Sequence, residues 1–466
     1  MDASEKLIKN QRLSELKFDE LPDIPKIWID FLNAALPILP ARSEMHALAE
    51  KAELVKKQSI QRGDLSRFFI DSHSQRSSKA SENIRLLGQP ESVVVIASLY
   101  TGLFGGVAFQ ILKCLTAIKV CDELARHAIT AVPVAWINSV SSPQPSAFAV
   151  NLLDGESELH RLQLEQPAAD AYATNVPLTL SQIASPLNQI EAIGRDIYDY
   201  EIIELLRSTF RPGTTIARAA GQLFASLMEE WGMLVVDPSS TEMQSILPKF
   251  DSGQVVPGDA HKKYPIQSSV LPVIACIIDP DEVASFISAQ PFFNRNGLVQ
   301  PLVWPRASAT VMDARSRRML ERYHLELNQL FSGEQAVTGN LMSAMPPAAL
   351  EKLDSLKAEI GARIDALKTL NSSEKELGRA VDSSREKILF QIDKLAQQFE
   401  TARKSRSETA RRQIHKACNF LAPNGKLQES ELAAIQLPLR YSRSILRSLY
   451  EKLDILNSEH QIISVD

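Results

Sequence analysis

The sequence predicts an α/β fold organised around a parallel β-sheet, and three observations in residues 91–136 lead to this prediction. A β-branched run at 93–96 is typical of a strand that is buried on both faces. A glycine turn at 102–106 follows it, and apolar residues between 111 and 124 then recur at helical spacing. A second apolar run at 132–136 completes a strand–turn–helix–strand unit, which predicts a right-handed crossover between parallel strands.

Further strands and helices alternate along residues 147–331, which extends the α/β core to about 330 residues. We expect short strands within 147–164 around a turn at Asp154-Gly155, and further strands at 233–236, 270–278 and 302–304. We expect helices at 190–207, at 215–231 with Thr214 or Thr215 as the N-cap, and at 281–290.

The composition changes near residue 333, and proline is absent from 348 to 418. Apolar residues within 353–367 and within 388–399 recur every three or four positions, which predicts two long antiparallel helices that turn near 371–373. Their apolar seams require a partner, either within the chain or in a second subunit. A last helix is expected over about 429–456. We therefore divide the chain into an α/β core with an N-terminal helical extension (1–345), an antiparallel coiled coil (346–418), and a C-terminal turn and helix that pack back on the core (419–466).

Composition and charge argue against several classes of protein. The formal net charge of −5 disfavours a dedicated nucleic-acid binder. The polar, charged start is unlike a signal peptide, and no run reaches the roughly 18 apolar residues of a membrane span. The four cysteines form no CxxC pair, as expected for reduced, buried thiols: Cys114, Cys121, Cys276 and Cys418. A cytoplasmic protein is expected.

Ligands of parallel sheets bind at the carboxyl ends of the strands, which directs attention to 97–106 and 137–145. The glycines of the first end are Gly102, Gly105 and Gly106, which either let the backbone approach a phosphate or carboxylate or serve a tight turn and close packing. Asn138 follows the second strand, and contact with a ligand and a role in the turn are equally compatible with its position.

A third candidate group lies in the segment PRASATV at 305–311. Arg306, Ser308 and Thr310 can hold an anionic group, with Arg306 as a bidentate donor, or Arg306 can form an ordinary surface ion pair. The sequence has no GxxxxGK[ST], GxGxxG, HExxH or GxSxG motif, and its histidines lack ligand spacing. No metal site is predicted.

With these segments in place, the chain resembles the bacillithiol biosynthesis cysteine-adding enzymes, the BshC family. The resemblance depends on four stretches in the same order: GLFGG (102–106) with the KCLTAIKVCDEL that follows, VPVAW (132–136), PRASATV (305–311), and PNGKLQE (423–429) with His460-Gln461 near the end. It covers nearly the whole chain.

The resemblance implies a Rossmann-like core and an antiparallel coiled coil that mediates homodimerisation. It also implies a ligase reaction in which L-cysteine is joined to glucosaminyl-malate through an amide to the sugar amine. Such a condensation needs an activated carboxylate, so ATP or another nucleotide activator is implied, and the cofactor itself stays unknown. The expected partners are therefore two small-molecule substrates and a second copy of the chain, with no nucleic acid and no membrane.

The sequence departs from the family pattern at both strand ends. Residues 97–100 read Ala-Ser-Leu-Tyr where the family has Thr-Gly-Gln-Gln, and residues 140–143 read Val-Ser-Ser-Pro where it has Glu-Asp-His-Asp. Gln267 and Glu282 are retained polar members of two further altered motifs and are candidates for ligand binding, although Glu282 can equally serve the first turn of a helix.

These departures leave two main hypotheses, ahead of a third in which a coiled-coil assembly protein merely carries an α/β domain. The first is a cysteine ligase of bacillithiol biosynthesis. The second is a catalytically impaired or repurposed relative that acts as a binding or interaction protein, because positioned acid–base groups each contribute about 10²- to 10⁴-fold in rate. The sequence identifies no catalytic residue.

Overall fold

The computed structural model describes residues 15–36, 45–72, 77–138, 145–164, 176–195, 197–247, 262–343, 348–370 and 375–465. Its centre is a five-stranded sheet with the order β6-β3-β2-β7-β8, in which all neighbouring strands are parallel. The strands are β2 (Val93–Tyr100), β3 (Ala131–Asn138), β6 (Leu234–Val236), β7 (Val273–Ile278) and β8 (Leu302–Pro305). The predicted α/β fold class and parallel sheet are confirmed.

The central strand β2 forms because its β-branched residues pack on both faces of the sheet, and 93–99 are all buried. Helix α6 (Phe109–Arg126) packs against β2 and β3 and connects them, as the apolar spacing predicted. The strand continues to Tyr100, four residues beyond the apolar run. Residues 97–100 therefore lie inside the strand, and not in the connection that follows it.

The strand order changes direction at β2. The chain runs from β2 to β3 and β6 on one side and later adds β7 and β8 on the other. In open sheets of this kind the crevice at such a reversal is the usual place for a ligand. The carboxyl ends of β2 and β7 therefore mark the expected position of a site.

Helices surround the sheet. They are α3 (Met45–Val55), α4 (Arg62–Ser72), α5 (Ser78–Leu87), α9 (Ile216–Leu227), α10 (Thr241–Ile246), α11 (Lys263–Val270), α12 (Val283–Ser288) and α13 (Gln290–Arg295). Of these, α9 and α12 lie within the ranges expected for helices at 215–231 and 281–290. Thr215 is the N-cap of α9, since its side chain accepts a hydrogen bond from the Arg218 N–H. The single helix expected over 190–207 is wrong: α7 (Leu180–Gly194) ends and α8 (Tyr200–Thr209) begins separately, because the Asp199 side chain caps a new helix.

A second sheet joins the two ends of the chain. Strand β10 (His460–Val465) lies between β9 (Ser308–Asp313), to which it is parallel, and β1 (Glu15–Leu16), to which it is antiparallel. The helix expected over 429–456 is wrong, because this stretch forms α19 (Gln428–Glu431), α20 (Gln436–Tyr441) and α21 (Ser444–Lys452). Leu432 is extended and Ser442 has a φ of 62°, so neither residue continues a helix.

The smaller elements link the core to the long helices. Strands β4 (Ala149–Leu153) and β5 (Leu159–Gln163) form the predicted antiparallel hairpin. The short helices α2 (Lys26–Leu32), α14 (Ala314–Tyr323), α15 (Leu327–Leu330) and α16 (Glu334–Ser343) complete the described elements of the core, together with single helical turns. Trp28 and Phe31 of α2 are buried, and this helix packs against α12.

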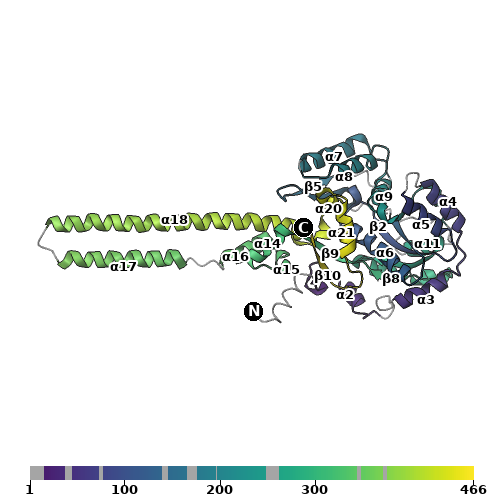
Figure 1. Ribbon diagram of the computed structural model, residues 1–466, viewed down its shortest axis with the longest axis horizontal. Coiled ribbons are helices and arrows are strands. Elements are labelled where there is room, and N and C mark those ends of the chain that lie inside the picture. Colours follow the sequence, from purple (N-terminus) through teal and green to yellow (C-terminus); the bar gives the residue numbers. More distant parts are fainter. Residues whose placement is uncertain are drawn as a thin grey trace.

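Two long helices project from the core, as predicted (Figure 1). They are α17 (Ala348–Leu370) and α18 (Lys375–Leu421), and they pack against each other. The expected turn at 371–373 lies outside the described residues. Helix α18 continues through residue 418, and from Ala410 onward many of its residues are buried against the core. The domain boundaries at 345 and 418 stay predictions.

None of the helices in the described ranges is long and apolar enough to cross a membrane.

Candidate functional site

A pocket of about 300 Å³ lies at the reversal of strand order. It is lined by Tyr100 of β2, by the residues that follow β7 and β8, and by two segments from near the ends of the chain. The lining residues are Phe18, Pro22, Asp23, Ile24, Pro25, Trp28, Tyr100, Phe109, Asp279, Pro280, Asp281, Arg306, Ser308, Lys426, Leu427, Glu429, Ser430 and Glu431. The N-terminal segment and the segment after α18 thus enclose a position that the parallel sheet alone would leave open.

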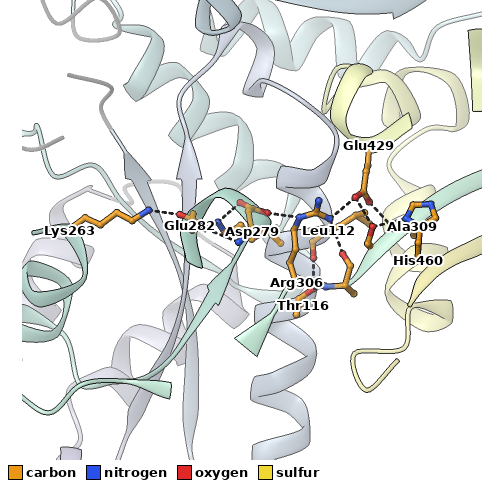
Figure 2. A network of polar contacts seen from close by, with 12 residues as sticks. Leu112, Thr116, Lys263, Asp279, Glu282, Arg306, Ala309, Glu429 and His460 are labelled. Carbon is orange, nitrogen blue, oxygen red and sulfur yellow. Dashed lines mark hydrogen bonds and ion pairs between the residues drawn. The ribbon is translucent and has the colours of Figure 1, made fainter. Parts of the chain in front are cut away.

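A chain of alternating charges runs through the protein, and three of its members line this pocket (Figure 2). Its members are Lys263, Glu282, Lys113, Asp279, Arg306 and Glu429, in that order. Three cations alternate with three carboxylates, so the formal charges cancel. Apart from Lys263, whose side chain is 11% exposed, each of these side chains is almost completely buried.

Lys113 occupies the centre of this chain of charges. Its Nζ lies 2.7 Å from Asp279 Oδ2 and also pairs with Glu282, and its side chain has no exposed surface. Burial lowers the pKa of a lysine, but the two carboxylates outweigh this effect and raise the pKa of Lys113 above its ordinary value. Burial would raise the pKa of Glu282, yet Lys113 and Lys263 lower it to about 2. Both groups are therefore charged at neutral pH.

Local sequence places the two carboxylates. Asp279 is the first residue after β7, and Glu282 follows three residues later in a single helical turn. Glu282 Oε2 accepts the Asp279 N–H at 3.0 Å, as in a capping box, so both side chains are fixed at the start of this turn. Lys113 reaches both carboxylates from α6, the helix that connects β2 to β3.

Arg306 is held from two directions. Its Nε donates to Asp279 Oδ1 at 2.5 Å, and its Nη1 lies 2.8 Å from Glu429 Oε1. The guanidinium carbon also lies 4.9 Å from the centroid of the Phe109 ring. Its Nη2 makes no hydrogen bond with any residue that the structure describes. Arg306 therefore lines the pocket in a fixed orientation, and no partner among the described residues accepts the two hydrogens of its Nη2.

Behind Glu429, four side chains form a buried hydrogen-bonded group. Ser308 Oγ lies 2.7 Å from Glu429 Oε1 and 2.6 Å from His460 Nδ1, and His460 Nε2 lies 2.8 Å from Thr310 Oγ1. Glu429 Oε2 accepts the Ala309 N–H at 2.8 Å (Figure 2). Burial lowers the pKa of His460 to about 4, so its imidazole is neutral near pH 7.

The structure brings three of the predicted ligand-binding residues together. Arg306 and Ser308 line the pocket, and Glu282 belongs to the same chain of charges. Thr310 is fully buried and contacts His460. Gln267 lies apart in α11, where its Nε2 donates to Ser98 Oγ at 2.8 Å and its Oε1 has no partner among the described residues. Their roles in ligand binding stay predictions.

The glycine turn lies beside the pocket and is closely packed. Gly105 has a φ of +86°, and a Cβ at this position would lie 3.1 Å from Leu223 Cδ2. A Cβ on Gly102 would lie 2.8 Å from the Cα of Gly106. The geometry satisfies the packing interpretation of these glycines. Contact between the turn and a ligand stays a prediction.

The second strand end is described only in part. Asn138 is the last residue of β3, and its backbone carbonyl accepts a hydrogen bond from Thr101 Oγ1 at 3.1 Å. Its side-chain Nδ2 has no partner among the described residues. The segment 140–143, which departs from the family pattern, lies outside the described residues.

Sequence reasoning missed Lys113, Asp279, Glu429, His460 and Tyr100 as members of this site. One signal was available for Lys113, which interrupts an apolar stretch of a predicted helix and therefore needs a buried partner. The Asp-Pro-Asp-Glu turn after β7 offered another. No group of His, Cys, Asp and Glu suited to a metal ion occurs among the described residues.

Comparisons with known proteins identify relatives across most of the chain. Residues 40–261 match the family model for the N-terminal Rossmann-like domain of the bacillithiol biosynthesis protein BshC, and residues 309–465 match the model for its C-terminal coiled-coil domain. A protein of Solibacter usitatus is 22% identical over 453 residues, covering 81% of this chain and 86% of the relative. Proteins of Salinibacter ruber (21% identity; 83% and 85% covered) and Koribacter versatilis (22%; 84% and 87%) are similar to the same extent. All three relatives are named "Putative cysteine ligase BshC".

Proposed function

Because the chain belongs to the BshC family of bacillithiol biosynthesis, we propose that it is a ligase that joins L-cysteine to glucosaminyl-malate. The new bond is an amide between the cysteine carboxyl carbon and the sugar nitrogen. An oxygen of the carboxylate leaves as part of the activating group, and the amine gives up a proton. ATP or another nucleotide is the cosubstrate that we propose for activation.

The observation that supports this proposal most directly is the pocket that Arg306 lines at the reversal of strand order. Asp279 and Glu429 hold the guanidinium so that Nη2 faces no protein acceptor among the described residues. A guanidinium binds carboxylate and phosphate groups strongly, and both proposed substrates carry a carboxylate. Arg306 therefore orients a carboxylate in this proposal.

The opposite charge is available at the same pocket. Asp23 and Asp281 line it and are exposed, and Glu431 lines it as well. A protonated amine is stabilised by carboxylates, so these residues suit the amino group of cysteine or of the sugar. In this proposal the pocket holds a ligand that carries both charges, as each substrate does.

The test is a ligase assay with the purified full chain. Glucosaminyl-malate, cysteine and ATP are supplied, and bacillithiol is detected by mass spectrometry, with an intact relative as the positive control. We expect product from the wild type and a loss of about tenfold or more in kcat/KM for Arg306→Lys, since a lysine cannot pair with both Asp279 and Glu429 and still offer a further fixed donor to a substrate. Absence of product from the wild type, alongside product from the relative, would overturn the ligase proposal.

One observation favours the alternative of a repurposed binding protein. Ala97, Ser98 and Leu99 are buried within β2, so this part of the altered strand end supplies no acid–base group to the pocket. The same assay separates the two functions. Binding of cysteine or glucosaminyl-malate by calorimetry without turnover is the outcome expected of a repurposed relative.

We also propose that the chain forms a homodimer through α17 and α18. Packing of the two helices leaves large apolar side chains exposed: Leu356, Leu367, Ile388, Phe390, Leu395 and Phe399, between 42% and 63%. Such an apolar surface on an isolated helical hairpin is typical of an interface. The double variant Phe390→Glu/Phe399→Glu should be a monomer by light scattering, whereas Leu180→Glu, at an equally exposed position of α7, should remain a dimer. A wild type that is itself monomeric would exclude this interface.

A further inference from the structure

With the His460 ring neutral, the hydrogen-bonded group behind Glu429 has only one arrangement of protons that satisfies every contact. Glu429 Oε1 faces the Arg306 guanidinium, and Glu429 Oε2 accepts the Ala309 N–H. The carboxylate is therefore an acceptor, and the Ser308 hydroxyl, 2.7 Å from Oε1, donates its single proton to it. Ser308 Oγ then has only lone pairs left for its second neighbour.

That second neighbour is His460 Nδ1, at 2.6 Å. Because Ser308 has no second proton, Nδ1 must carry the hydrogen and donate it to Ser308 Oγ. The imidazole is neutral, so Nε2 is bare and accepts the hydroxyl proton of Thr310 at 2.8 Å. The other tautomer would leave Ser308 and Glu429 as two acceptors 2.7 Å apart in a buried site, which is unfavourable.

The second sheet delivers His460 to this position. In the parallel pairing of β9 and β10, His460 lies directly opposite Ser308. The side chain is completely buried, as is that of Thr310. The strand near the end of the chain thus brings a histidine against a carboxylate that contacts the pocket-lining arginine.

We propose that His460, as its Nδ1–H tautomer, is a positioning residue that acts through Ser308 and Glu429 to fix the orientation of Arg306 in the pocket. Ser308 keeps its proton directed at Glu429 because His460 supplies the other hydrogen bond. Glu429 in turn binds Nη1 at the edge of the guanidinium, so that Nη2 remains available to a ligand. The consequence for substrate rests on the proposed function, in which Arg306 orients a carboxylate.

Two substitutions separate this role from simple packing. His460→Asn places an amide donor near the position of Nδ1, and His460→Gln places it near Nε2 instead. His460→Gln loses the hydrogen bond to Ser308, whereas His460→Asn keeps it. We therefore expect His460→Gln to raise KM for the carboxylate substrate about tenfold more than His460→Asn does, with a smaller change in kcat. An increase in KM for His460→Asn that equals or exceeds that for His460→Gln would overturn the proposal, because asparagine is the smaller residue and a packing role would make it the worse replacement.

A second measurement does not depend on activity. Nitrogen NMR of the full chain with labelled histidine reports which ring nitrogen of His460 is protonated, and the Arg306 Nε–H signal reports whether the guanidinium is fixed. We expect the Nδ1–H tautomer at neutral pH, and an Arg306 Nε–H that exchanges faster with water in His460→Gln than in His460→Asn. An Nε2–H tautomer or a charged ring at neutral pH would overturn the inference. If the wild type makes no bacillithiol, the proposed function fails, and the NMR result alone decides the role of His460.

Discussion

The carboxyl ends of β2 and β7 lie next to each other in one parallel sheet, but their residues interact in opposite ways. After β2 the chain makes a glycine turn whose Leu103 and Phe104 are buried, and the Phe104 ring lies 5.1 Å from that of Phe210. After β7 it places Asp279 and Glu282 against buried cations. One end is closed by apolar packing, and the other depends on paired charges.

This difference teaches that the sheet determines where a site can form and distant residues determine which strand end becomes one. The turn after β2 packs against apolar partners, Leu223 and Phe224 of α9 and Ala434. The turn after β7 becomes a charged site only because Lys113 and Arg306 reach it from elsewhere in the chain. Substitutions at the two ends should therefore fail for different reasons.

The largest effect is expected for Lys113→Met. The substitution keeps most of the volume but leaves Asp279 and Glu282 buried beside each other without their shared cation. Loss of one partner of a buried ion pair costs about 3–5 kcal/mol, so the free energy of unfolding in urea should fall by that amount. Lys79→Met is the matched control, because Lys79 pairs with Glu82 on the surface, where such a pair contributes about 1 kcal/mol or less. Similar losses for the two variants would contradict the central role of Lys113.

The same contrast explains what the sequence alone could predict. Strand and helix patterns depend on near neighbours, so β2, α6, β3 and the two long helices were predicted from periodicity. Arg306, Ser308 and Glu282 were singled out from residue type and motif. The pairing of Lys113 with Asp279 joins residues 166 positions apart, and that of Ser308 with His460 joins residues 152 apart. No local pattern encodes such contacts.

The C-terminal region was predicted least well for a related reason. Its apolar residues were compatible with one helix over 429–456, but the chain is extended at Leu432, whose carbonyl accepts the Ala108 N–H, and the next N–H, that of Ala433, donates to the Asn151 carbonyl. Tertiary pairing outweighed the local preference. His460 was quoted as part of a family motif, and only the sheet places it beside Ser308.

A second, smaller effect is the dependence of the free energy of unfolding on pH through His460. The pKa of His460 is lowered from 6.5 to about 4. Between these two pH values the unfolded chain binds a proton at His460 and the folded protein does not. The stability that depends on neutral His460 is fully present above pH 6.5 and is lost as the pH falls through 4. Between pH 7 and pH 4 the wild type should lose about 3 kcal/mol more than His460→Asn, which has no titrating group there.

Urea unfolding of both proteins at a series of pH values measures this difference, since the remaining titrating groups are common to the two. The glycine turn at 102–106 contains no titrating group, so it should not contribute to the change in the free energy of unfolding with pH. Parallel curves for the wild type and His460→Asn would mean that His460 is exposed to solvent or already charged in the folded protein.

The smallest effect tests the glycine end itself. Gly105 and Gly213 have nearly the same φ, +86° and +82°, so alanine should cost each about 1 kcal/mol in backbone strain. Only at Gly105 would the new Cβ meet a side chain at 3.1 Å, whereas nothing lies within 4 Å of it at Gly213. Gly105→Ala should therefore lower the free energy of unfolding by about 1 kcal/mol more than Gly213→Ala.

The two interpretations of the glycine turn predict different ligand affinities for Gly105→Ala relative to Gly213→Ala. If the turn serves packing, Gly105→Ala loses stability and its affinity for cysteine or glucosaminyl-malate, measured by calorimetry, follows that of Gly213→Ala. If the backbone approaches a ligand, affinity falls for Gly105→Ala by more than for Gly213→Ala under conditions where both variants are fully folded. The buried Leu103 and Phe104 and the contact with Leu223 favour the first result, because a turn that already fills its surroundings has no free face for an anion.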